Sequence, residues 1–130
     1  MQKTVGFLRE ILGYEMESAE RYRRFISLVM VGSVSGGRKI ETLLASKMRN
    51  CDVMANLDGS VLILMSETNR QGAETAIERY KQEDFNDYDL RFSLVTFPED
   101  GRGVDNFLSA ATRRLKKAFG GEPGSVMTTG

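Results

Sequence analysis

Residues 52–65, DVMANLDGSVLILM, decide the fold that this sequence predicts. Two runs rich in strand-forming residues flank the pair Asp58-Gly59, and Asp-Gly favours a type I′ turn because both of its positions need a positive φ. We therefore expect a β-hairpin whose strands span residues 52–57 and 60–65.

The segments before the hairpin predict a central strand and two helices. Residues 25–31, FISLVMV, form a nearly continuous apolar run, which is typical of a strand covered on both faces. A helical pattern of apolar residues over 5–24 precedes this strand and predicts an N-terminal helix. After a turn at Gly36-Gly37, apolar residues again recur at helical spacing: Ile40, Leu43, Leu44 and Met48.

The segments after the hairpin predict a helix, a strand and a last helix. The first of these helices is marked by Ala73, Ala76, Ile77 and Tyr80. Thr68 or Asn69 is placed to cap it. Residues 90–97, LRFSLVTF, form a strand that ends at Pro98. The last helix has its apolar face at Val104, Phe107, Leu108, Ala111, Leu115 and Ala118.

Without the N-terminal helix, the predicted order of elements is β-α-β-β-α-β-α. A βαββαβ core is the ferredoxin-like arrangement, in which helices pack on one face of an antiparallel sheet. We therefore predict an α+β fold, an α/β sandwich, with one extra N-terminal helix. A single domain is expected over residues 1–121, followed by a flexible tail over residues 122–130.

Composition narrows the chemistry that this chain is expected to perform. Its 130 residues carry a formal net charge of +0 and include no histidine and one cysteine, Cys51. A neutral chain is not expected to bind nucleic acid by neutralising phosphates. Without histidine, neither a zinc site nor a Ser-His-Asp or Cys-His catalytic set is expected. No secretory signal and no bilayer-spanning apolar run is found, so we expect a cytoplasmic location without membrane contact.

A glycine-rich stretch at residues 29–44, VMVGSVSGGRKIETLL, has the layout of a phosphate-binding loop. The strict motif is not met, because the lysine is displaced by one position and no Ser or Thr follows it. The phosphate-binding loop also belongs to larger, mostly parallel sheets. Two interpretations stay open. One is a tight turn with solvated cations, which we favour. The other is a weak anion site formed by Ser35, Gly37, Arg38 and Lys39.

Four segments resemble bacterial GGDEF domains in order and spacing. They are RRFISLVMV (23–31), RNCDVMANLDGSVLILMSET (49–68), SLVTFPEDG (93–101) and LSAATRRLKKAFGG (108–121). The resemblance covers about residues 20–121 and implies a nucleotide-cyclase-type form of the ferredoxin-like fold. It also implies a place in cyclic di-GMP signalling, because GGDEF domains condense two GTP molecules into cyclic di-GMP.

The GGDEF signature is degenerate in this chain. Its five positions fall on Asp58, Gly59, Ser60, Val61 and Leu62. In active members of the family, the acidic pair of the signature binds metal and assists attack by the 3′-hydroxyl of GTP. Ser60 and Val61 stand in the place of that pair here.

Two further family aspartates are replaced as well. One of them, a metal ligand at the end of the first strand, falls on Gly32, and the other falls on Val34. The guanine-reading segment of the family is replaced by the short turn SVSGGRK. Phosphoryl transfer of this kind needs a divalent metal held by hard oxygen ligands. The resemblance therefore predicts a chain without metal, cofactor or diguanylate cyclase activity.

An R-x-x-D pattern, Arg49 to Asp52, lies five residues before the degenerate signature. GGDEF domains carry their inhibitory site for cyclic di-GMP at this offset. A guanidinium can stack on guanine or bind phosphate, and a carboxylate can accept the two donors on the Watson-Crick edge of guanine. A purely structural interpretation stays open, because Arg49 also lies at the end of a helix, where a cation complements the helix dipole.

Two hypotheses of function follow. In the first, the chain is a catalytically inactive signalling domain that binds cyclic di-GMP, or a related guanine nucleotide, through Arg49 and Asp52. In the second, it is a protein–protein interaction or dimerisation module in bacterial signal transduction. Such a module binds no small ligand and docks a signalling protein or a second copy of the chain.

Overall fold

The computed structural model describes residues 3–34, 40–82 and 89–130, and within these ranges it contains four helices and five strands. The helices are α1 (Val5–Tyr22), α2 (Ile40–Ala45), α3 (Arg70–Lys81) and α5 (Val104–Phe119). The strands are β1 (Ile26–Ser33), β2 (Val53–Leu57), β3 (Ser60–Ser66), β4 (Leu90–Phe97) and β5 (Val126–Met127). No helix in the described ranges combines the length and the apolar character needed to cross a membrane.

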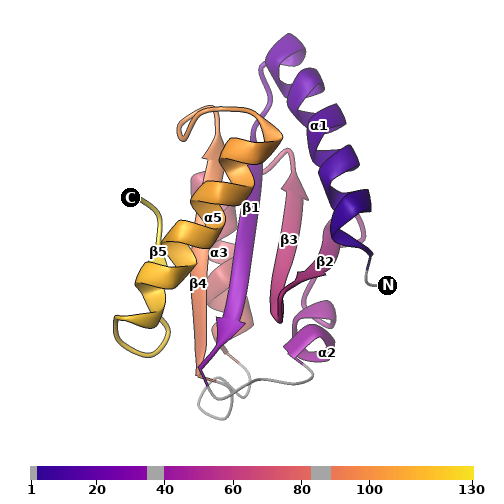
Figure 1. The fold of residues 1–130 in the computed structure, drawn as a ribbon. Coiled ribbons are helices and arrows are strands. Elements are labelled where there is room, and N and C mark those ends of the chain that lie inside the picture. Colours follow the sequence, from indigo (N-terminus) through magenta and orange to yellow (C-terminus); the bar gives the residue numbers. More distant parts are fainter. Residues whose placement is uncertain (1–2, 35–39, 83–88) are drawn as a thin grey trace.

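The strands form one sheet in the order β2-β3-β1-β4-β5 (Figure 1). Neighbouring strands pair antiparallel from β2 to β4, whereas β5 runs parallel to β4. The chain order β1-α2-β2-β3-α3-β4 confirms the predicted βαββαβ core. The α+β fold class predicted from the sequence is therefore confirmed.

The hairpin between β2 and β3 forms as predicted. Asp58 and Gly59 have φ values of 52° and 86°, so both turn positions are left-handed, as a type I′ turn requires. Leu57 and Ser60 pair directly across the turn. Asn56 Oδ1 also accepts a hydrogen bond from the Gly59 N–H at 3.2 Å, which holds the turn in place.

β1 lies inside the sheet and is buried on both faces. It pairs with β3 on one edge and with β4 on the other, so that Val29 lies opposite both Ile63 and Leu94. Side chains alternate between the two faces along a strand. Leu28 and Met30 accordingly join one hydrophobic cluster, and Val29 joins another.

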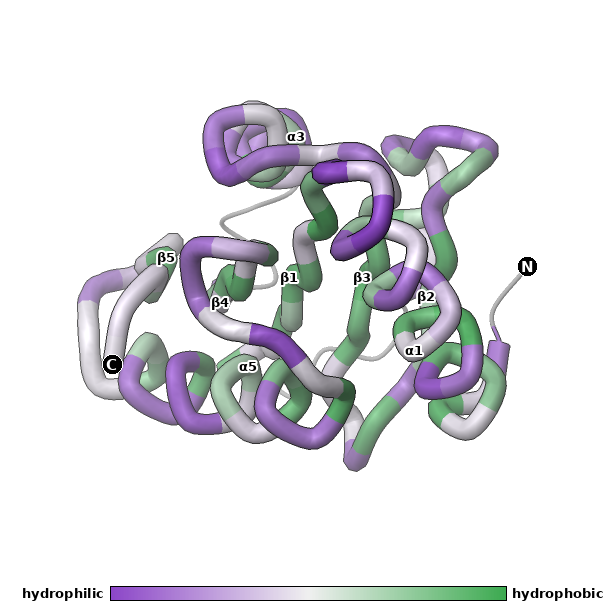
Figure 2. Tube along the Cα trace, turned by 90° about the horizontal axis from the view of Figure 1, so that it is seen from above, coloured by the Kyte–Doolittle hydropathy of each residue, from purple (hydrophilic) through white to green (hydrophobic). Residues whose placement is uncertain are grey.

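Each hydrophobic cluster is closed by two helices. α2 and α3 cover one face of the sheet, and α1 and α5 cover the other (Figure 1, Figure 2). The prediction that helices pack on one face of the sheet is thus correct for α2 and α3, the two helices of the βαββαβ core. It does not hold for α1 and α5, which pack on the other face. The opposite face is apolar too, and it is covered by the apolar stripe of α1, which includes Leu8 and Leu12, and by Phe107 of α5.

The last residues of the chain pack along the edge of the sheet. The Phe92 N–H donates to the Ser125 carbonyl at 2.9 Å, and the Gly124 N–H donates to the Leu90 carbonyl at 3.1 Å. The tail expected over residues 122–130 therefore contains a strand, β5. Two residues are too few to show an alternating pattern in a sequence, and β5 depends on the backbone groups that β4 offers at its outer edge.

Arg114 of α5 is buried and joins the helix to the sheet. Its Nη1 donates to the Leu94 carbonyl at 2.7 Å, and its Nη2 lies 3.2 Å from Asp100 Oδ1. The other carboxylate oxygen of Asp100 accepts a hydrogen bond from the Thr96 N–H at 2.8 Å. When a buried ion pair loses one partner, the remaining charge keeps its cost of desolvation.

We expect Arg114→Met to lower the free energy of unfolding by about 3 kcal/mol, because it leaves the Asp100 carboxylate without its cation. Urea unfolding followed by circular dichroism measures this loss. Lys116→Met removes an exposed cation from the same helix and is the matched control, with an expected change below about 0.5 kcal/mol. Equal losses in the two variants would contradict the assigned role of Arg114.

Candidate functional site

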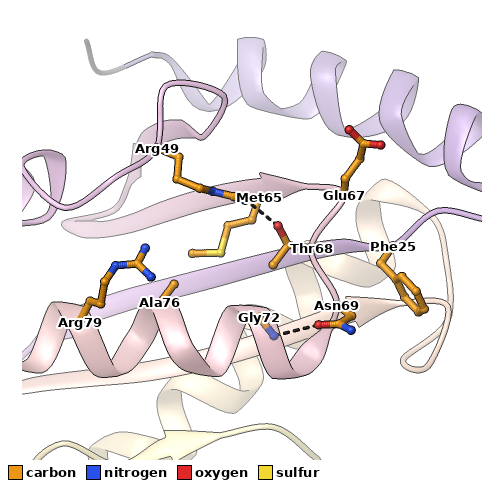
Figure 3. A pocket seen from close by; sticks show the side chains of 9 residues that line it. All are labelled: Phe25, Arg49, Met65, Glu67, Thr68, Asn69, Gly72, Ala76 and Arg79. Atoms are coloured by element: carbon orange, nitrogen blue, oxygen red, sulfur yellow. Dashed lines mark hydrogen bonds between the residues drawn. The ribbon is translucent and has the colours of Figure 1, made fainter.

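A cavity of about 260 Å³ lies where the end of β3 approaches the first turns of α3 (Figure 3). Its lining residues are Phe25, Arg49, Met65, Glu67, Thr68, Asn69, Gly72, Ala76 and Arg79. Glu67 extends away from Arg49 and Arg79 in Figure 3. Its Oε1 lies 3.7 Å from Nε of Arg24. The cationic groups therefore dominate the wall of the cavity, which favours an anionic ligand.

The start of α3 forms one side of this cavity. Asn69 is the N-cap of the helix, and its side chain accepts a hydrogen bond from the Gly72 N–H at 2.8 Å. Of the two caps that the sequence allowed, Asn69 is therefore the correct one. Thr68 is buried instead, and its hydroxyl donates to the Ser66 carbonyl at 2.8 Å.

Arg49 is held at the cavity by two side chains. Its Nη2 donates to Thr68 Oγ1 at 2.7 Å and to Asp52 Oδ1 at 3.1 Å. The Arg49 N–H also donates to Asp52 Oδ2 at 3.0 Å, so both oxygens of Asp52 contact the same residue. The hydrogen bond with Asp52 raises the pKa of the Arg49 guanidinium, which stays charged.

Arg49 and Asp52 differ in how far their side chains are exposed. The Asp52 side chain is 1% exposed, whereas the Arg49 side chain is 47% exposed. The structure therefore brings the predicted Arg49–Asp52 pair together, with the carboxylate turned inward and the guanidinium at the surface of the cavity. In this arrangement Asp52 orients Arg49, and Arg49 has further N–H groups with which to contact an anion.

Arg79 is a cavity residue that the sequence analysis missed. It lies on α3, thirty residues beyond Arg49, and faces the cavity together with Ala76 one helical turn earlier (Figure 3). The helical pattern predicted that Ala76 faces inward, so its spacing of three residues to Arg79 was an available signal. No signal in the sequence indicated that Arg79 lines the same cavity as Arg49, since this depends on how α3 packs against the sheet.

Tyr80 follows Arg79 and belongs to the core rather than to the cavity wall. Its side chain is fully buried, and within the described residues its hydroxyl has no hydrogen-bond partner. Burial raises the pKa of Tyr80 to about 12, and the negative charge of Asp52 adds to the shift. The hydroxyl therefore stays protonated at neutral pH.

The five positions to which the resemblance assigns the GGDEF signature, residues 58–62, lie at the other end of the hairpin from this cavity. Asp58 and Gly59 form the turn, and Ser60 begins β3. Val61 and Leu62 are fully buried and join opposite hydrophobic clusters. These five positions supply one carboxylate, at the exposed tip of the turn.

Gly32 lies against the last turn of α5. A Cβ atom at this position would lie 2.6 Å from Phe119 Cζ, so even an alanine needs the ring to move. Val34 is exposed nearby in the chain. Together with Ser60 and Val61, these residues do not fit a divalent metal ion, which needs several hard oxygen ligands. Among residues 3–34, 40–82 and 89–130, no three His, Cys, Asp or Glu side chains are grouped closely enough to hold a metal ion.

The candidate anion-binding turn of Ser35, Gly37, Arg38 and Lys39 lies outside the described residues. The preference for a tight turn over an anion site at this position therefore stays a prediction.

No protein-family model and no curated protein sequence matches this chain. Solved structures do match it over nearly its whole length. The GGDEF domain of PA1120 (YfiN or TpbB) from Pseudomonas aeruginosa superposes with a TM-score of 0.89 at 13% identity, covering 99% of this chain and 97% of that chain. The GGDEF domain of DgcB from Caulobacter crescentus, in complex with c-di-GMP, gives 0.84 at 10% identity, covering 98% and 88%.

A third similar structure contains a protein partner. The diguanylate cyclase SiaD from Pseudomonas aeruginosa, in complex with its activator SiaC, gives a TM-score of 0.79 at 16% identity, covering 95% of this chain and 57% of that chain. At these identities the similarity establishes the fold alone. The chain has the nucleotide-cyclase-type α+β fold of GGDEF domains, as its resemblance to that family implied.

We expect the raised pKa of Tyr80 to make stability depend on pH above pH 10. The folded chain keeps the Tyr80 proton that the unfolded chain releases near pH 10. The contribution of Tyr80 to the free energy of unfolding is therefore fully present below pH 10. It then falls by about 2 kcal/mol as pH rises towards 12.

Urea unfolding of the wild type and of Tyr80→Phe at pH 8.5 and 11.5 measures this effect, because the variant has no hydroxyl to ionise. The wild type should lose stability relative to the variant between the two pH values. An unchanged difference would contradict a buried, neutral Tyr80.

Proposed function

We propose that this chain is a signalling domain of the GGDEF fold that binds cyclic di-GMP at the Arg49 cavity and does not cyclise GTP. The observation that carries the proposal is the position of Arg49, which Asp52 and Thr68 hold half-exposed at the cavity. Arg79 places a second guanidinium in the same wall.

The chemistry of the ligand fits two guanidinium groups. Cyclic di-GMP carries two phosphodiester charges and two guanine rings, and a guanidinium can bind a phosphate in a fork or stack on a purine face. Arg49 enters such a complex with its rotamer already set, which reduces the entropy that binding must overcome. Asp52 acts through Arg49 in this proposal, because both of its oxygens contact that residue.

The comparisons support a ligand of this class. DgcB, whose GGDEF domain superposes with a TM-score of 0.84, was solved in complex with c-di-GMP. We transfer this binding to the present chain as a hypothesis, because the identity of 10% carries the fold and not the function.

The proposed loss of cyclase activity has a separate basis. The positions at which the family resemblance implies acidic groups hold Gly32, Ser60 and Val61. A carboxylate at position 32 would also collide with the ring of Phe119. Asp58 is the one carboxylate among the five signature positions, and one hard anionic ligand is too few to hold the divalent metal ion that would neutralise the charge on a transferring phosphoryl group.

A protein-binding function without a small ligand is the alternative. α1 exposes two aromatic side chains, Tyr14 at 71% and Tyr22 at 60%, and exposed aromatic residues are enriched at protein interfaces. SiaD, which has the same fold, was solved with an activator protein. Calorimetry with cyclic di-GMP separates the two functions, because the alternative predicts no heat of binding.

We expect isothermal titration calorimetry to detect cyclic di-GMP binding to the wild type. Arg49→Ala and Arg79→Ala should each raise the Kd at least about tenfold, because each removes charge-assisted hydrogen bonds to the ligand. Arg49→Lys keeps the charge but not the fork, and it should have an intermediate Kd. Lys116→Ala, on the other face of the sheet, is the control and should leave the Kd unchanged. The absence of heat at high micromolar ligand would exclude the proposed site.

We also expect no conversion of GTP when the wild type is incubated with Mg²⁺ or Mn²⁺ and the mixture is separated by ion-exchange chromatography. An active diguanylate cyclase in the same buffer is the positive control. Clear formation of cyclic di-GMP would show that other residues supply the metal ligands, and it would leave the result of the calorimetry untouched.

A further inference from the structure

A groove of about 620 Å³ runs between α1 and α5, on the face of the sheet opposite α2 and α3. The two helices are joined near the start of α5, where Arg9 Nη2 lies 2.7 Å from Asp105 Oδ1. They separate along the second half of α5 (Figure 1). The groove shares no lining residue with the Arg49 cavity.

The floor and the rim of the groove differ in polarity. Its apolar side chains are Val5 of α1, Leu57 at the end of β2, and Leu108 of α5. Its charged side chains are Arg9, Arg113 and Lys116, and no carboxylate of residues 3–34, 40–82 and 89–130 lines the groove. The rim is therefore cationic around an apolar floor, although the net charge of the whole chain is +0.

The cations of the rim are available to a partner to different degrees. Arg9 pairs with Asp105, and Arg113 Nε donates to the Gly130 carbonyl at 2.5 Å. Lys116 is exposed and has no ion-pair partner among the described residues. Ser109 and Thr112 add exposed side chains between the helices. A partner that brings carboxylates to this rim meets cations whose charge is only partly neutralised.

We propose that this groove docks an acidic, amphipathic peptide segment of a partner protein. Carboxylates of the segment pair with Arg113 and Lys116, and a large apolar side chain rests on the floor at Leu57 and Leu108. The cationic rim favours a partner with negative charge, and the recessed apolar floor favours a partner with a protruding apolar side chain.

The shape and lining of the groove favour a peptide over other anionic partners. A lipid surface needs apolar groups that project from the protein, whereas Leu108 here is buried at the base of the groove. A nucleotide base is usually held by stacking on an aromatic ring, and among the described residues no aromatic side chain lines this groove. A peptide satisfies both the apolar floor and the cationic rim.

The test is a ¹⁵N NMR titration of the full chain with a synthetic helical peptide. In this probe, leucine recurs at i, i+3 and i+4, and glutamate fills the other positions. A control peptide has lysine in place of each glutamate. We expect the acidic probe to shift the amide signals of Leu57, Leu108 and Thr112, and the basic peptide to leave them in place.

Two variants make the result specific. Arg113→Glu combined with Lys116→Glu should weaken binding of the acidic probe at least tenfold, and both side chains are exposed, so the dispersion of the spectrum should be retained. Arg49→Ala, on the other side of the sheet, should bind the probe like the wild type. This proposal and the one for cyclic di-GMP therefore succeed or fail separately.

Four results of the peptide titration would overturn the proposal. They are no shift at millimolar acidic probe, an equal response to the basic peptide, an affinity unchanged in the charge-reversed variant, and shifts confined to other surfaces. Two further experiments test other occupants of the groove: phosphatidylglycerol vesicles test a lipid surface, and sedimentation velocity tests a second copy of the chain. Vesicle binding that the acidic probe cannot displace would assign the groove to a lipid surface, and a dimer abolished by charge reversal would assign it to a second copy.

Discussion

The fold depends on one strand that is buried on both faces and paired on both edges. β1 contacts β3 and β4 through its backbone, and its side chains enter two separate hydrophobic clusters. A strand in this position has no surface that tolerates water, so each face needs a layer of helices. α1 and α5 are therefore as integral to the fold as the two helices of the βαββαβ core.

A polar residue of the same strand connects this core to the Arg49 cavity. Ser27 of β1 is fully buried, and its hydroxyl lies 2.8 Å from the Thr68 carbonyl and 3.2 Å from Thr96 Oγ1. Thr68 in turn accepts the hydrogen bond from Arg49. A side chain at the molecular surface is thus positioned through a chain of buried and partly buried hydrogen bonds that begins in the central strand. Such a chain restricts the arginine to one orientation, which is what recognition of a planar base or a phosphate requires.

Local patterns predicted the parts of the structure that local interactions determine. The Asp58-Gly59 turn needs two left-handed residues, and the Arg49–Asp52 pair lies within one turn of chain, so both could be inferred from spacing. Tertiary packing determined the rest. That Arg79 lies beside Arg49, that Phe119 covers Gly32, and that α1 shares a face with α5 all depend on how helices settle on the sheet. No single segment of the sequence contains that information.

Residues at two of the positions where the family resemblance implies acidic groups contribute to packing. Val61 is fully buried in the cluster beneath α2 and α3, and Gly32 leaves room for the ring of Phe119. A carboxylate at either position, without a metal ion to balance it, would carry a desolvation cost of several kcal/mol. Active sites commonly retain such unfavourable groups because the reaction needs them, and a domain that only binds is free of that requirement. Apolar packing at this end of the hairpin and an oriented arginine at the other end are what the proposed function, binding without catalysis, requires.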